Sequence, residues 1–313
     1  MIIVQYSLLN RFRGALLGSV LGEMKGSQGQ DQNRLELSPV RLSEEIATNI
    51  EINLQLPWND IAVSCAQSLI RCGRLDLKDL VRHNYYLLPE NMSVSCSEAA
   101  IATLPVGLFF HEHEVTLQQK LTIAASTLMP DCGNSLGVLA VGYAIAQALT
   151  EKLHPLSLIP QILTYLDDVQ TPFTQQLSIV QTELTHGAGL EKVVNQLCRN
   201  SNHSTTPIAL AFYCFLSTPQ DFRLSLLRAL RTNYHPQTTA ALTGALSGAY
   251  NSLLGIPLGW RIACDRNNKL EVIQLAERLL AVWSGVYDTS TTYDSDQVAI
   301  AAPRVIQPRL GGY

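Results

Sequence analysis

The feature that most constrains this fold is an uncharged segment in the last third of the chain, residues 233–260. Small residues recur there every four positions, at Ala240, Gly244, Gly248 and Ser252. Residues four apart lie one above another on a helix, so the segment predicts a helix with one nearly smooth face. Each glycine inside a helix costs roughly 1 kcal/mol relative to alanine, and close packing of a second helix would offset that cost. The polar residues at the start of the segment predict a loop that leads into this buried helix.

A second glycine stripe lies near the N-terminus, where Gly14, Gly18 and Gly22 have the same four-residue spacing. A helix with this stripe has the smooth face that close packing against the helix in 233–260 requires. We therefore expect the two stripes to pack against each other within one domain.

The composition limits the kinds of partner that the chain can have. Charged residues make up 15% of the 313 residues, against roughly 25% in an average domain. So few charges favour either a deeply buried central helix or an apolar partner surface. The net charge of −4, with no cluster of Lys and Arg, argues against binding to nucleic acid.

The sequence also favours a protein without a membrane span or a disulfide framework. Its seven cysteines are scattered and never have the Cys-x-x-Cys spacing of many zinc sites. The N-terminus lacks a basic region and its apolar run ends at Glu23, unlike a signal peptide. The Thr, Ser, Asn and Pro residues of 233–260 indicate a buried helix instead of a membrane-spanning one. We expect a reduced, cytoplasmic protein.

Helical periodicity and helix boundary signals run along most of the chain, whereas no period-2 run bounded by hairpin turns appears. We predict an all-α fold, a single compact bundle of roughly ten to thirteen helices over residues 1–286. Residues 287–313 lack periodicity and predict a partly irregular tail. The expected helices, besides the two glycine-striped ones, cover 38–50, 61–70, 76–88, 99–110 with a bend at Pro105, 117–127, 136–149, 157–167, 173–184, 190–199, 208–216 and 270–283. The segment 221–231 leads into the loop before the second stripe.

The two stripes also carry a resemblance to a known family. Arg13-Gly-Ala-Leu-Leu-Gly-Ser-Val-Leu-Gly-Glu23 and Ala241-Leu-Thr-Gly-Ala-Leu-Ser-Gly-Ala249 resemble the first and last signature helices of the ADP-ribosylglycohydrolase family. The resemblance extends over about residues 11–283 and implies a compact all-α bundle.

The resemblance also implies where the chemistry of the family would lie. Its members hold two magnesium ions between a Thr-Asp-Asp-Thr motif and an Asp-Thr-Asp-Thr motif, and Mg²⁺ prefers such hard oxygen ligands. The first motif falls here on 58–61, where Asp60 keeps a carboxylate and Asn59 replaces one. In the second, the aspartates fall on His235 and Gln237, and only Thr238 is retained. One of four aspartates therefore remains.

Two further carboxylates stand at positions that the family signature marks. Glu23 closes the first glycine stripe, where the family has an aspartate, and Glu98 replaces a glycine in an Asn-Gly-Ala-x-Met-Arg segment, here 97–102. The resemblance thus implies a set of family-equivalent positions: Glu23, Asn59, Asp60, Glu98, His235, Gln237 and Thr238.

Most of these residues also have a structural interpretation. Asn59 or Asp60 stands where it would cap one helix, and Gln237 and Thr238 stand where they would cap another. Ser95 with Glu98 has the spacing of a capping box. His235 fits a solvated loop. His111-Glu-His-Glu114 contains metal-binding residue types, but its spacing favours a solvated helix end.

Three hypotheses follow. The first is a pseudoenzyme that lacks the dinuclear magnesium centre, needs no cofactor, and binds a protein partner or an ADP-ribose-like ligand. The second is an active hydrolase that removes ADP-ribose from a protein or small molecule, using magnesium held by Asp60, Glu23 and Thr238, with Glu98 nearby. The third is a scaffold whose pocket is filled by Trp58, Ile61 and Tyr234. We favour the first and third together.

Overall fold

The computed structural model describes residues 7–31, 57–84, 94–128, 135–167, 169–199, 204–266 and 270–285. These segments contain fifteen α-helices and no strand, which confirms the predicted all-α fold. The helices are α1 (Leu8–Asp31), α3 (Pro57–Cys72), α4 (Leu77–Asn84), α5 (Cys96–Ala102), α6 (Leu104–Phe109), α7 (Glu114–Leu128), α8 (Leu136–Leu149), α9 (Leu158–Tyr165), α10 (Pro172–Thr185), α11 (Leu190–Arg199), α12 (Thr206–Leu216), α13 (Phe222–Arg231), α14 (Pro236–Gly255), α15 (Leu258–Arg266) and α16 (Leu270–Trp283).

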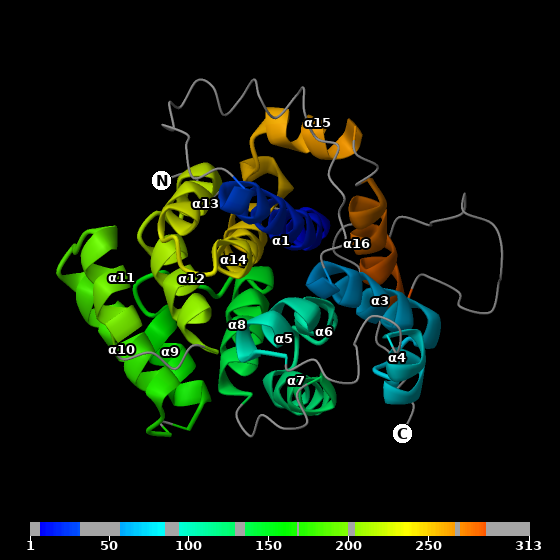
Figure 1. The fold of residues 1–313 in the computed structure, drawn as a ribbon. Coiled ribbons are helices and arrows are strands. Elements are labelled where there is room, and N and C mark those ends of the chain that lie inside the picture. Colours follow the sequence, from blue (N-terminus) through cyan, green and yellow to red (C-terminus); the bar gives the residue numbers. More distant parts are fainter. Residues whose placement is uncertain are drawn as a thin grey trace.

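Helices α1 and α14 lie side by side in the middle of the molecule, and the other helices surround them (Figure 1). Helices α8, α12 and α13 pack on α14, whereas α16 packs on α1. Helices α9, α10 and α11 form one flank, and α3, α4 and α16 lie on the opposite side of the view (Figure 1). The two segments with glycine stripes therefore form the centre of the bundle.

The two glycine stripes meet in antiparallel register. A Cβ atom added to Gly14 would lie 2.2 Å from the carbonyl oxygen of Gly248, and one added to Gly18 would lie 2.1 Å from that of Gly244. At Gly22 the nearest atom would be the carbonyl oxygen of Ala240, at 2.0 Å. Real Cβ atoms do not approach backbone this closely. The absence of a side chain at Gly14, Gly18 and Gly22 is therefore what allows the two backbones to touch, as the sequence predicts.

The fourth position of the later stripe does not continue the helix. Ser252 has φ 62° and ψ −179°, which interrupts α14 before its last turn. The expectation that this residue extends the smooth helical face is therefore wrong, although it is buried and its backbone still lies against Gly14. Arg11 lies at this interruption: its Nη1 donates to the carbonyl oxygens of Ala249 and Tyr250 at 3.2 and 2.9 Å. The guanidinium thereby pairs carbonyl groups near the break.

The helix count is higher than the sequence predicts. The 99–110 segment divides at Thr103 into α5 and α6, with Pro105 in the first turn of α6, so the expected bend is a break. Helix α15 follows Pro257 and has no counterpart among the predicted segments. The predicted helix over 38–50 and the predicted tail over 287–313 lie outside the described residues.

No helix in the described segments combines the length and apolar character needed to cross a membrane. A cytoplasmic location stays a prediction. Among the described residues, the cysteines at 65, 72, 96, 198 and 214 form no disulfide. Burial raises the pKa of the Cys65 and Cys214 thiols to about 12.

We expect one glycine-to-alanine change to have opposite effects at two helical positions. Gly18→Ala places a methyl group against the backbone of Gly244 and should lower the free energy of unfolding by about 1–3 kcal/mol or more. Gly259→Ala, on α15, meets no atom within 4 Å and should raise it by up to about 1 kcal/mol, because alanine favours the helix. Urea unfolding of both variants measures the difference. Equal effects would show that the α1–α14 contact is looser than described.

We also expect the buried thiols to be inert in the folded protein. The thiolate is the reactive form, and both burial and the raised pKa suppress it at Cys65 and Cys214. After brief treatment with a thiol reagent at pH 8, peptide mass spectrometry should find label on Cys72 and none on these two residues. Treatment in denaturant is the control and should label all three. Label on Cys65 in the folded protein would contradict its burial.

Candidate functional site

The family-equivalent positions come from four helices of the central bundle. Glu23 lies on α1, Asn59 and Asp60 lie on α3, and Glu98 lies on α5. His235, Gln237 and Thr238 stand at the start of α14. Helix α5 packs against both α3 and α14, and α1 packs along α14 (Figure 1). The fold therefore brings together the elements that carry these residues.

Helix α1 makes a direct contact with the start of α14. A Cβ atom added to Gly26 would lie 2.4 Å from the Cα atom of Gln237, so this glycine extends the close approach by one more turn. Helix α1 also contacts α3, because the Ser19 hydroxyl donates to the Asn59 side-chain oxygen at 3.4 Å. Glu23 lies one helical turn beyond Ser19 and is 2% exposed. Sequence reasoning did not single out Ser19, although its four-residue spacing from Glu23 places both on one helix face.

The Glu98 carboxylate forms a capping box at the start of α5. Its Oε2 accepts hydrogen bonds from the backbone N–H of Ser95 at 2.8 Å and from the Ser95 hydroxyl at 2.6 Å. The Ser95 Oγ in turn accepts from the backbone N–H of Glu98 at 3.3 Å. This reciprocal pairing satisfies backbone groups at the helix start. The capping box predicted from the spacing is confirmed, and one oxygen of this carboxylate is engaged in it.

Helix α3 begins earlier than the sequence suggests. Pro57 is its first residue, a position that proline favours because its missing N–H has no partner in a helix start. Asn59 and Asp60 consequently lie in the first turn, and the expectation that either caps the helix is wrong. Asp60 is exposed and Asn59 is half-buried. The carboxylate of Asp60 still suits the positive end of the helix.

His235 precedes α14 in a left-handed backbone conformation, with φ 41° and ψ 59°. It is exposed, as the loop interpretation predicts, and its ring meets the Tyr234 ring edge-on at 4.9 Å. Helix α14 starts at Pro236, so Gln237 and Thr238 lie inside its first turn and are half-buried. The expectation that these two residues cap α14 from outside is therefore wrong.

The residues that the third hypothesis expects to fill the family's pocket differ in burial. Ile61 is fully buried and belongs to the main core cluster. Tyr234 is half-buried, and burial raises the pKa of its hydroxyl, an effect that a hydrogen bond with Thr206 opposes. The side chain of Trp58 lies outside the described residues.

In the part of the chain that the structure describes, no three His, Cys, Asp or Glu side chains are grouped so that they could hold a metal ion. His111 is not solvated, contrary to expectation: it is 6% exposed and its Nδ1 lies 2.7 Å from the carbonyl oxygen of Leu108. Its ring lies 4.8 Å from the Trp283 ring and 5.7 Å from the Phe12 ring, measured between centroids. His111 therefore joins α1 and α16 to the end of α6.

We expect Glu98 to stabilise the protein through its hydrogen bonds. Glu98→Ala removes the acceptor and should lower the free energy of unfolding by about 0.5–2 kcal/mol, whereas Glu98→Gln keeps an acceptor and should cost much less. Urea unfolding of both variants tests this. Ser95→Ala, alone and combined with Glu98→Ala, is the control, and the two losses should not add because they remove one interaction. Additive losses would contradict the reciprocal cap.

Comparison with known proteins agrees with the fold and the glycine stripes. The sequence model of the ADP-ribosylglycohydrolase family matches residues 5–289. A comparison with curated protein sequences gives no match. Among solved structures, the fold is similar to a chain of an ADP-ribosylglycohydrolase-related protein complex, with a TM-score of 0.63 and 18% sequence identity. The similarity covers 88% of this chain and 99% of that chain, and at this identity it concerns the fold alone. Because the family match spans nearly all of the sequence, this chain belongs to the ADP-ribosylglycohydrolase family.

Proposed function

We propose that this protein is a pseudoenzyme of its family that binds an ADP-ribose-like ligand without a dinuclear magnesium centre. The observation that carries the proposal is the capping box of α5. The Glu98 carboxylate accepts two hydrogen bonds from Ser95 there, so a structural role accounts for this carboxylate. A carboxylate that maintains a helix start is poorly placed to serve as a metal ligand as well.

The remaining charge at the family-equivalent positions is a poor match for two magnesium ions. Besides Glu98, only Glu23 and Asp60 carry carboxylates, and together they offer two negative charges against four positive ones. These two also differ in environment, because Glu23 is 2% exposed whereas Asp60 is exposed to solvent. Uncompensated charge at a partly buried site is costly. The donor set therefore disfavours the dinuclear centre.

The groups that replace the aspartates are suited to binding a polar ligand directly. Asn59 and Gln237 have side-chain amides, each with two donor hydrogens and an acceptor oxygen, and His235 has an imidazole. Such neutral groups are weak ligands for Mg²⁺ but can orient the hydroxyl and phosphate groups of a nucleotide-like molecule. Their positions at the starts of α3 and α14 add the positive ends of two helices. These features support metal-independent binding.

A second candidate function is a hydrolase that uses one magnesium ion with Asp60, Glu23 and Thr238. The observation that favours it is the burial of Glu23 on the same face of α1 as Ser19, which contacts Asn59 on α3. A cation is one way to stabilise a buried carboxylate. The two candidates differ in whether ligand binding needs the metal.

The test is thermal unfolding of the protein alone, with Mg²⁺, with ADP-ribose plus a chelator, and with ADP-ribose plus Mg²⁺. A ligand at 100 times its dissociation constant that binds only the folded state adds about 2.7 kcal/mol to the free energy of unfolding. We expect ADP-ribose to raise the midpoint of unfolding, and to raise it by the same amount with Mg²⁺ and with the chelator. A rise that requires both components would overturn the proposal in favour of the hydrolase. No rise with ADP-ribose under any condition would overturn both.

A matched pair of variants tests whether ADP-ribose raises the midpoint by binding at the family-equivalent positions. Gln237→Ala removes an amide at the start of α14 and should reduce the rise caused by ADP-ribose. Gln119→Ala makes the same change at an exposed position of α7 and should leave the rise unchanged. If both variants retain the full rise, ADP-ribose binds elsewhere than at these positions.

A further inference from the structure

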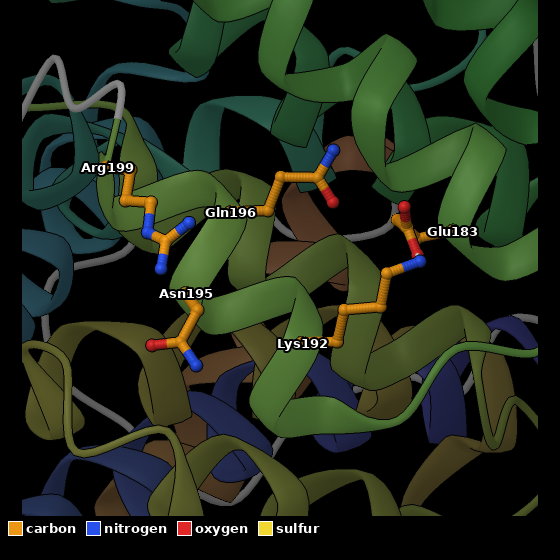
Figure 2. Close-up of a pocket in the computed structure, with 5 residues that line it drawn as sticks. All are labelled: Glu183, Lys192, Asn195, Gln196 and Arg199. Carbon is orange, nitrogen blue, oxygen red and sulfur yellow. The ribbon is translucent and has the colours of Figure 1, made fainter.

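A pocket of about 620 Å³ lies between α10 and α11, on the flank of the bundle. This volume is within the range of roughly 300–1,000 Å³ that small-molecule sites occupy. None of the residues that line it is a family-equivalent position, so it lies outside the site described above. The lining side chains that the structure describes are polar: Glu183 from α10, and Lys192, Asn195, Gln196 and Arg199 from α11 (Figure 2).

An ion pair between a buried carboxylate and an exposed lysine lies at one end of this pocket. The Glu183 side chain is 6% exposed, and its Oε2 accepts a hydrogen bond from Lys192 Nζ at 2.7 Å. The Lys192 side chain is 62% exposed, so its ammonium group joins a buried carboxylate to the open side of the pocket. The pair joins α10 to α11 and neutralises the carboxylate of Glu183. A carboxylate buried to this degree needs such a partner.

The other end of the pocket carries hydrogen-bond donors. Arg199 and Asn195 are four residues apart on α11, and Figure 2 shows their head groups on the same side of the helix. Within the described segments, the side chains of Arg199, Asn195 and Gln196 form no hydrogen bond or ion pair with the protein. A guanidinium group has five N–H donors and no acceptor, and each amide adds two donors. Donors without internal partners are available to a ligand.

The charge of the pocket defines the class of ligand. Among the described lining residues, Lys192 and Arg199 contribute two positive charges and Glu183 one negative charge, a sum of +1 in a protein whose net charge is −4. A guanidinium group matches the planar geometry of a carboxylate or the oxygens of a phosphate group. Val193 and Leu197, on the other face of α11, are buried in the core and fix the helix that presents these donors.

We propose that this pocket is a second binding site, which takes a small ligand through its carboxylate or phosphate group. Arg199 and Asn195 donate hydrogen bonds to the anionic group of the ligand. Gln196 contacts the body of the ligand along α11, and Lys192 adds positive charge while it remains paired with Glu183. The site is independent of whether the family-equivalent positions bind ADP-ribose.

The experiment is calorimetric titration of the full chain with succinate and, separately, with inorganic phosphate at constant ionic strength. The two probes distinguish a carboxylate from a phosphate as the preferred group. We expect the protein to bind at least one of them. Arg199→Ala should weaken that binding roughly tenfold or more, as expected for loss of a charge-assisted hydrogen bond. Arg82→Ala, an exposed arginine on α4 at the opposite side of the molecule (Figure 1), should leave it unchanged.

Removal of the carboxylate from the pocket lining should have the opposite effect on anion binding. Glu183→Gln removes the negative charge from the lining and frees the Lys192 ammonium group, so anion binding should tighten. Glu191→Gln makes the same change at an exposed residue of α11 that does not line the pocket, and should have less effect. A solvated polar helix face without a site predicts no binding of either probe, or equal responses of Arg199→Ala and Arg82→Ala. Either outcome would overturn the proposal.

Discussion

The close contact between the backbones of α1 and α14 is the interaction on which the rest of this structure depends. Gly14, Gly18 and Gly22 leave no side-chain atoms between the helices, so the backbone of α1 rests directly on the carbonyl groups of α14. Dispersion contacts are individually small but accumulate over three helical turns. A charge on these faces would be cut off from water, and this explains the composition of α14, which is buried without a break from Thr239 to Ala249. Its hydroxyls bond within the helix, as Thr243 Oγ1 does to the carbonyl oxygen of Thr239 at 2.7 Å.

This contact also determines where the candidate site lies. Because the register is antiparallel, the last turns of α1 lie beside the first turn of α14, and Gly26 meets the backbone of Gln237. Glu23 is fixed one turn earlier, near the point where Ser19 reaches Asn59 on α3. At the opposite end of the contact, the interruption at Ser252 and the Arg11 guanidinium terminate the paired region. A shift of one helical turn between α1 and α14 would therefore change the site as well as the core.

The sequence reveals the central pair because glycine spacing is a local pattern with one physical explanation. It also reveals the Ser95–Glu98 capping box, again a relation over three residues. It does not reveal that His111 is buried between Phe12 and Trp283, because those residues lie on α1 and α16, far away in the sequence. The sequence places the start of this helix at 61, whereas α3 begins at Pro57, because a proline is equally consistent with the end of one segment and with the first position of a helix.

The candidate site is harder to predict than the fold for a reason that this protein illustrates. The residues that fix the fold and the residues that would perform the chemistry are different sets, so either can change alone. By the resemblance, Asn59 and Gln237 stand in first helical turns where the family has aspartates, and such a replacement leaves the α1–α14 contact untouched. By the same resemblance, Glu98 stands where the family has glycine, and here it stabilises the start of α5. A family match therefore carries the glycine stripes and the bundle with it, whereas activity has to be argued from the donors that remain.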